Sequence, residues 1–339
     1  MPINRRTLFL GAAFATAMAA SGAALAQDVD VAAAKKEGKV VWYTSTPVEL
    51  AQAIAGDFEK ETGIKVELFR SGGSAILRRF QQELSAGLVA TDVLTHSDPG
   101  IADAFAEKGY YVPFKPKGFD QVPAAAKDPN GQWVAQRLNL IAAYYRSDLI
   151  PEAEAPKTLA ELADAKYKGK TVMADPNFAS LQVAVDGTIA QKHGWDFFKK
   201  LRQNDVMVVQ GAQQVVDMVK RGERPVAVAA SISYAIDAIS EGHKLKPIYP
   251  ADGTFVVASP TGVVKGSPNP NAAKLFAEFL LSPKQQEAVT KFGALAALPD
   301  IPPPPGNPAL STLTITPIDY GKMEKETAAI KREFTKIFQ

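Results

Sequence analysis

The chain has no cysteine, and this absence excludes several kinds of site. Disulfide bonds, thiolate nucleophiles and thiolate metal ligands all require cysteine, and a bacterial lipoprotein would need one to carry its lipid. Histidine is scarce as well: His96, His193 and His243 are scattered, with no carboxylate near them at the spacing of a metal site. The sequence therefore predicts no metal centre, no cofactor and no lipid anchor.

Recognisable catalytic motifs are also missing. The sequence has no Gly-x-Ser-x-Gly motif around a nucleophile and no phosphate-binding loop of the Gly-x-x-x-x-Gly-Lys-Ser/Thr type. Asp98, Asp175 and Asp237 could act as catalytic carboxylates, but none has a partner at a recognisable spacing, and helix caps and turns are commoner roles for aspartate. We therefore expect a protein that is not an enzyme, with a secreted hydrolase as the alternative.

Charge of one sign is not in excess. The chain has 38 basic and 36 acidic residues, and Arg5 and Arg6 account for the difference, so residues 27–339 are formally neutral. Proteins that bind nucleic acid or anionic lipid generally carry a basic surplus on the binding surface. We therefore expect no nucleic-acid partner.

The first 26 residues have the pattern of a secretory signal peptide. Arg5 and Arg6 form a basic start, Leu8–Ala20 is apolar, and Ala24–Ala26 supplies small residues before the cleavage point. The apolar run is shorter than the ~20 residues that a spanning helix needs, which disfavours a membrane anchor. We predict cleavage between Ala26 and Gln27 and export by the Sec or the twin-arginine route.

Downstream of the signal peptide, short β-rich runs alternate with amphipathic helical patterns. This order predicts an α/β fold in which mainly parallel sheets are flanked by helices. The predicted strands are 39–44, 64–69, 92–95, 138–145, 171–174, 206–209, 225–230 and 254–264. The predicted helices are 47–62, 74–88, 100–108, 159–165, 181–193, 196–203, 213–221, 271–281, 283–292 and 319–338.

These elements form two groups, separated by a proline-containing loop at Tyr110–Gln132. The chain is expected to pass between the groups near Asn139–Ala143 and Pro250–Thr254, so that two lobes can close on a ligand by hinge motion. The predicted divisions are a signal peptide at 1–26, an N-terminal lobe of 27–138 plus 252–300, and a C-terminal lobe of 139–251 plus 301–339.

Polar residues follow nearly every predicted strand, where ligands bind in parallel α/β sheets. The sharpest signal is Arg70–Ser74: Gly72 and Gly73 let backbone amides approach an anion, Ser74 opens a helix, and Arg70 offers a planar fork. A turn with a solvent-facing arginine would give the same pattern, but polar loops recur in both halves of the chain. The candidate ligand-binding residues are Ser45, Thr46, Arg70, Ser71, Gly72, Gly73, Ser74, Ser97, Asp98, Asn177, Ser180, Ser233 and Tyr234.

Several stretches, in their order along the chain, resemble one protein family. They are Val40–Ser45, Phe58–Val66, Asp92–Leu94, Ala174–Pro176, Ser267–Phe276 and Phe279–Gln286. The chain resembles bacterial extracellular solute-binding proteins of ABC importers, in the branch with ferric-iron-, phosphonate- and sugar-phosphate-binding members. The resemblance implies the two-lobed periplasmic-binding-protein fold of type II, with a two-strand hinge. It also implies a periplasmic protein, which we expect to be a monomer, that delivers a small-molecule ligand to a membrane permease; a chemoreceptor partner shares this fold and stays an alternative.

The same resemblance bears on the ligand. Iron-binding members typically have two adjacent tyrosines after the strand that corresponds to Pro225–Ala230, because phenolate oxygens suit a ferric ion. Here Ser231–Ala235 contains one tyrosine, Tyr234, and Thr44–Thr46 lacks the histidine that some iron binders place nearby. We therefore expect a small organic anion (a phosphonate, a phosphate ester or a carboxylate) bound through Arg70 and neighbouring hydroxyls, with ferric iron as the alternative.

Overall fold

A computed structural model describes residues 29–339, so the predicted signal peptide lies outside the described residues. The first half of the chain alternates strand and helix, as expected. Its three strands are parallel and lie side by side in the order β2-β1-β3. The elements are α1 (Val31–Glu37), β1 (Lys39–Thr44), α2 (Val48–Thr62), β2 (Lys65–Arg70), α3 (Gly73–Ser85), β3 (Val93–Thr95) and α4 (Pro99–Glu107).

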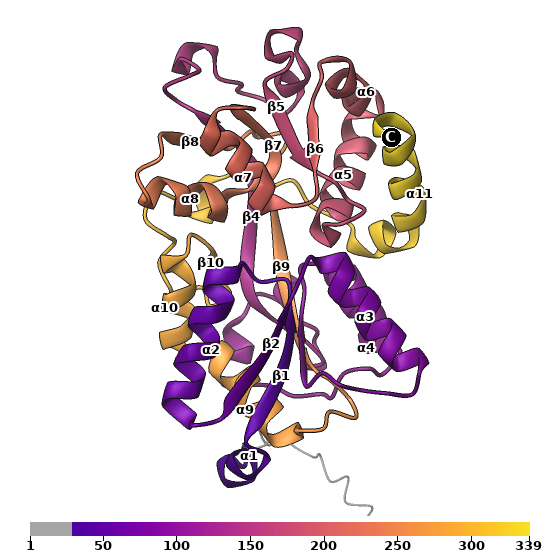
Figure 1. The fold of residues 1–339 in the computed structure, drawn as a ribbon, viewed down its shortest axis with the longest axis vertical. Coiled ribbons are helices and arrows are strands. Elements are labelled where there is room, and N and C mark those ends of the chain that lie inside the picture. Colours follow the sequence, from indigo (N-terminus) through magenta and orange to yellow (C-terminus); the bar gives the residue numbers. More distant parts are fainter. Residues whose placement is uncertain (1–28) are drawn as a thin grey trace, which may run out of the picture.

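Two long antiparallel strands connect the lobes. β4 (Val134–Arg146) and β9 (Phe255–Val263) pair along much of their length and run through the middle of the molecule (Figure 1). β9 also pairs with β3 in one lobe, and β4 pairs with β7 in the other. The sheets of both lobes are thereby joined into one ten-stranded sheet, whose main path is β2-β1-β3-β9-β4-β7-β5-β6.

The second lobe repeats the alternation. β5 pairs in parallel with both β6 and β7, while β8 and β10 attach to β4. Its elements are β5 (Thr171–Ala174), α5 (Ser180–His193), α6 (Asp196–Gln203), β6 (Met207–Val209), α7 (Ala212–Arg221), β7 (Val226–Ser231), α8 (Ile232–Ser240) and β8 (Leu245–Ile248). After β9 come α9 (Pro270–Leu280), α10 (Pro283–Lys291), β10 (Leu295–Ala296) and α11 (Tyr320–Phe338).

The predicted α/β fold with two lobes and a two-strand hinge is confirmed. α9 contacts β1 and β9 in the first lobe, and α11 lies against α5 and α6 in the second. The predicted lobe boundaries at 138/139, 251/252 and 300/301 stay predictions. No helix within residues 29–339 combines the length and the apolarity needed to cross a membrane.

Some local predictions differ from the structure, and α1, β8 and β10 were not predicted. The expected helix at 159–165 is a pair of short 3₁₀ turns, Ala160–Ala163 and Ala165–Tyr167. Asp164 between them has an extended backbone with ψ of 148°, which ends the first turn. Conversely, α8 was not predicted, although Ile232, Ala235 and Ile236 recur at helical spacing and are buried.

The sheet of the first lobe is covered on both faces because its central strand has apolar side chains on each side. Trp42 and Tyr43 are neighbours in β1 and therefore point to opposite faces. Trp42 packs with Phe58 and Phe276 from α2 and α9, whereas Tyr43 belongs to a cluster with Phe80 and Phe105 from α3 and α4. Burying each such side chain stabilises the fold by about 1.5–3 kcal/mol.

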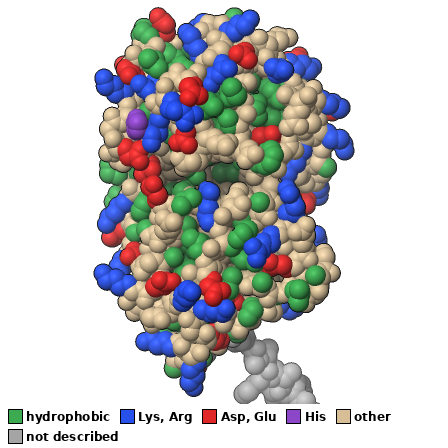
Figure 2. All heavy atoms as spheres, viewed as in Figure 1, with side chains coloured by type: hydrophobic (Ala, Val, Ile, Leu, Met, Phe, Trp, Pro, Cys, Tyr) green, Lys and Arg blue, Asp and Glu red, His purple; other side chains and the backbone are tan. Residues whose placement is uncertain are grey.

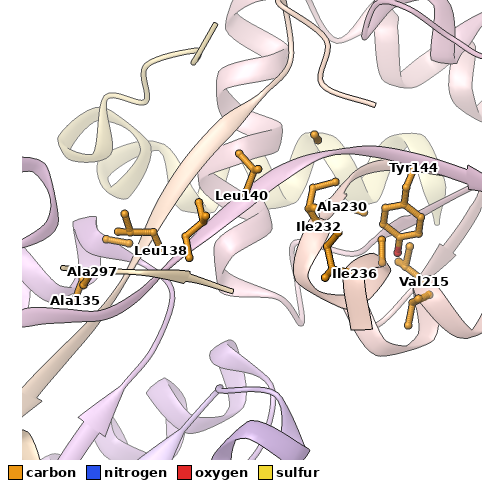
Figure 3. Packing of buried hydrophobic residues seen from close by; sticks show 14 of the residues in the cluster. Ala135, Leu138, Leu140, Tyr144, Val215, Ala230, Ile232, Ile236 and Ala297 are labelled. Carbon is orange, nitrogen blue, oxygen red and sulfur yellow. The ribbon is translucent and has the colours of Figure 1, made fainter. Parts of the chain in front are cut away.

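One apolar cluster spans both lobes on one side of the hinge. Figure 3 shows Leu138 and Leu140 of β4 in line with Ala297 on one side and with Ile236 of α8 and Val215 of α7 on the other. All five side chains are buried. The hinge therefore passes over a continuous core, and this side of the lobes stays packed.

Candidate functional site

A cavity of about 480 Å³ lies between the lobes at the ends of their strands. Figure 2 shows the hollow between the two halves of the molecule, with basic side chains near it. Residues from both lobes line the cavity, as the hinge prediction requires. The predicted ligand-binding residues on its wall are Ser45, Arg70, Ser71, Gly72, Gly73, Ser74, Ser97, Ser180 and Tyr234.

Four other candidates lie beside the wall and hold neighbouring groups. Thr46 is fully buried, and its hydroxyl accepts a hydrogen bond from Arg137 Nη1 at 2.9 Å. Asn177 donates from Nδ2 to Asp175 Oδ1 at 2.8 Å, and Asp98 caps α4 by accepting from the amide of Ile101 at 3.2 Å. Their role as ligand contacts stays a prediction.

The fourth of these candidates, Ser233, lies within hydrogen-bond distance of Ser231, with 3.0 Å between their hydroxyl oxygens. Ser231 lines the cavity, whereas Ser233 lines a second cavity of about 320 Å³. The two cavities share Pro47, Gln213 and Tyr234. Ser233 therefore contacts a wall residue of the main cavity but lines the second cavity itself.

Arg137 is the most informative wall residue that sequence reasoning missed. It is 2% exposed, and Nη1 donates to Thr46 Oγ1 and to Gln136 Oε1, at 2.7 Å for the latter. Its Nε is buried without any hydrogen-bond partner. Burial, reinforced by the nearby charge of Arg70, lowers the pKa of Arg137 to about 10, so the group is still cationic at neutral pH.

The structure explains why Arg137 was missed. It lies inside the apolar run of β4, and the register of β4 against β9 shifts between Ala135 and Leu138. A signal was present in the sequence, since Gln136 and Arg137 are adjacent polar residues in a mainly apolar strand. Asn139, two residues further on, also lines the cavity and donates to Ser259 Oγ at 2.8 Å.

The cavity wall is positively charged. Among residues 29–339, its ionised side chains are Arg70, Arg78 and Arg137, and no aspartate or glutamate lines it. None of the ion pairs found within residues 29–339 involves these three arginines. Arg70 Nε donates to the carbonyl oxygen of Thr46 at 3.0 Å. This hydrogen bond holds the guanidinium group of Arg70 beside Tyr234. Burial raises the pKa of Tyr234, although the charges of both arginines oppose the shift.

Five helices begin at this wall without a side-chain cap. They are α2, α3, α5, α7 and α8, whose N-cap residues are Pro47, Gly72, Ala179, Gly211 and Ser231. Away from the wall, side chains cap α1, α4, α10 and α11, through Asp30, Asp98, Ser282 and Asp319, whereas α6 and α9 have no side-chain cap either.

Uncapped helix N-termini favour negative charge. Two wall hydroxyls, Ser45 Oγ and Ser74 Oγ, are also buried without partners. Together with Arg137 Nε, the wall thus presents several groups suited to the oxygens of an anion. Within the described part of the chain, no cluster of three histidine, aspartate or glutamate side chains is arranged to hold a metal ion.

Comparisons with known proteins agree with this arrangement. The family described as bacterial extracellular solute-binding protein matches residues 53–312. A protein of Serratia marcescens named Fe(3+)-binding periplasmic protein is 25% identical over 264 residues, which cover 75% of this chain and 77% of its own. A protein of Salmonella typhimurium, provisionally named as a 2-aminoethylphosphonate-binding periplasmic protein, is 25% identical over 249 residues, 69% of each chain.

Among solved structures, the periplasmic binding protein AfuA from Actinobacillus pleuropneumoniae has a similar fold. Its structure with bound fructose 6-phosphate superposes with a TM-score of 0.80 at 21% identity. The match covers 89% of this chain and 98% of that one. At this identity the likeness establishes the type II binding-protein fold.

Proposed function

This chain belongs to the bacterial extracellular solute-binding protein family, and we propose that it captures a small organic anion between its lobes and delivers it to the permease of an ABC importer. Family members of this kind are periplasmic and work with a membrane permease. Their role is binding and transport, which points away from catalysis. Cleavage of residues 1–26 would release the protein into the periplasm, where it would act as a monomer.

The observation that supports an anionic ligand best is the buried arginine on the wall. A buried ionised group is costly without an opposite charge, and no carboxylate lies on the wall with Arg137. Planar guanidinium groups bind carboxylate and phosphate oxygens through two parallel hydrogen bonds. The geometry favours a ligand whose negative group is held between Arg70 from one lobe and Arg137 at the start of the hinge.

A thermal-shift panel tests this function. The purified chain from Gln27 is melted with phosphonates, phosphate esters and carboxylates at millimolar concentration. One of these classes is expected to raise Tm, since a ligand that binds only the folded state stabilises it by RT ln(1 + [L]/Kd). Arg70→Ala should abolish the shift. If no compound raises Tm, or if Arg70→Ala shows the same rise in Tm as the parent, the proposal is contradicted.

Ferric iron is the second candidate, because relatives are named for it. Tyr234 is the one tyrosine on the cavity wall within the described chain, and no carboxylate joins it there. A single phenolate supports a ferric ion poorly. Iron–phenolate complexes absorb visible light, so a protein that stays colourless after ferric citrate loading rules iron out, and a visible band that Tyr234→Phe removes would establish it.

A further inference from the structure

Along one edge of the cleft the two lobes touch each other directly. Figure 1 shows α3 and α4 of the first lobe next to α5 and α11 of the second, and contacts join α3 to α5 and α4 to α11. We call this contact the glycine edge, because the first lobe contributes Gly72, Gly73 and Gly100 to it. Across the edge, the amide of Ser74 donates to the carbonyl oxygen of Phe178 at 3.4 Å.

The glycine edge has no room for a side chain. A Cβ on Gly100 would lie 2.7 Å from the carbonyl oxygen of Tyr320 and 3.1 Å from Glu324 Cβ, both on α11. A Cβ on Gly73 would lie 2.2 Å from Ser180 Oγ and 3.1 Å from Ser180 Cβ. The obstacle to a Cβ on Gly100 is backbone, so rotating a side chain cannot relieve it.

Local preference does not account for these glycines. Gly73 and Gly100 lie in the first turns of α3 and α4, with no positive φ recorded for either. At ordinary helical angles alanine is the better residue, by up to about 1 kcal/mol in a helix interior. The glycines are therefore explained by the opposite lobe.

We infer that Gly100, which lies outside the cavity, sets the affinity for the ligand by letting α4 close onto α11. The inference rests on the proposed function, since closure matters to affinity only if a ligand is captured between the lobes. The apparent Kd of a site that binds in one conformation rises as that conformation becomes less populated. A methyl group at Gly100 should therefore weaken binding and speed ligand release without touching any wall residue.

The experiment compares Gly100→Ala with Gly56→Ala, a matched control in α2 of the same lobe where a Cβ would meet no atom within 4 Å. Because the chain has no cysteine, Lys60→Cys and Lys200→Cys place a fluorophore on each lobe at exposed positions. Single-molecule energy transfer then reports the lobe separation. Each protein is measured alone and with inorganic phosphate, methylphosphonate and fructose 6-phosphate in turn.

We expect a short-distance population in the parent and in Gly56→Ala that Gly100→Ala reduces by about tenfold or more. For any probe that binds, its Kd should rise by the same factor. An equal short-distance population in Gly100→Ala, or none in the parent under any condition, would overturn the inference. If no probe binds but Gly100→Ala still removes the short-distance population, capture of phosphate and phosphonate anions fails and the role of the glycine edge in closure stands.

A second pair of substitutions distinguishes a loss of closure from a folding defect. Gly73→Ala should open the lobes in the same way, and Ser180→Gly in the same chain should restore closure because it removes the atoms nearest to the new Cβ. Such rescue is a coupling between two neighbouring positions, which general destabilisation does not produce. If the double variant stays as open as Gly73→Ala, the contact between Gly73 and Ser180 does not control closure.

Discussion

The two edges of the cleft meet in different ways. At the glycine edge, Gly100 lies against the backbone of Tyr320 and Gly73 against the side chain of Ser180, with no space for a methyl group at either position. At the opposite edge, formed by α2 against α7 and α8, the lobes leave the second cavity, which has Glu49, Asp237 and Glu241 on its wall. Glu241 is paired with Lys220 at 2.6 Å, whereas no ion pair found within residues 29–339 involves Glu49 or Asp237. The glycine edge is thus a tight contact, whereas carboxylates from both lobes line the wall of the other edge, which we call the acidic edge.

The largest effect is expected from Arg137, which lies between the two edges. Arg137→Gln should weaken binding of the anion identified by the thermal panel by about 10- to 100-fold, the range for losing hydrogen bonds to a charged group. Titration calorimetry measures this change. Arg202→Gln, on the exposed side of α6, is the control and should bind like the parent. A tenfold weakening of both variants would point to a long-range field rather than to direct contact.

A smaller effect is expected at Asp98, on the glycine edge. Burial raises the pKa of Asp98 to about 6, opposed by its hydrogen bonds to backbone amides and by the charge of Lys331 on α11, while Glu324 on the same helix reinforces the rise. Because the folded protein holds the proton more tightly than the unfolded chain, this carboxyl costs stability as pH rises from about 4 to 6.

Asp98→Asn should remove that cost. The variant keeps a residue that can cap α4, and it should be more stable than the parent at pH 7.5 by about 1–2 kcal/mol, with the gain lost near pH 4. Chemical denaturation at the two pH values checks this difference. A variant that is less stable than the parent at pH 7.5, with a smaller deficit at pH 4, would show that the ionised carboxylate stabilises the contact with Lys331.

The smallest effect is expected at the acidic edge. Burial first, and then the charges of Glu49 and Glu241, raise the pKa of Asp237. Asp237→Asn should tighten anion binding by about two- to fivefold at low salt, as for partly exposed charges, and the gain should shrink as salt is added. Asp300→Asn, an exposed carboxyl outside both cavities, is the control. If Asp237→Asn weakens binding instead, the second cavity holds a positive group of the ligand.

The comparison also shows where sequence reasoning works. Most strands and helices of both lobes follow from apolar spacing because each signal lies within about a dozen residues. The wall at Arg70–Ser74 was found since strand ends meet at one edge of a parallel sheet. Arg137 was not predicted as a site residue because its environment depends on the irregular pairing of β4 with β9 and on Thr46, about 90 residues away.

The contacts of the glycine edge could not be predicted from the sequence, for a related reason. Gly72 and Gly73 were interpreted as freedom for a ligand to approach amides, and the structure adds that Gly73 makes room for Ser180 of the other lobe. Nothing near Gly100 in the sequence points to Tyr320, because the two residues meet only when the lobes are assembled. Contacts between distant segments depend on tertiary packing, which local patterns do not encode.

The strand β4 has a mechanical consequence. Its backbone is hydrogen-bonded to β9 on one side and to β7 and β8 further along, so the sheet continues through the hinge, with register shifts between Ala135 and Leu138 and between Ala142 and Tyr144. We expect the lobes to move by twisting of the paired strands, so that the energy of the motion is distributed over many hydrogen bonds and not concentrated at one flexible residue. The amides of Leu138–Ile141 should therefore exchange with deuterium as slowly as the core in every position of the lobes.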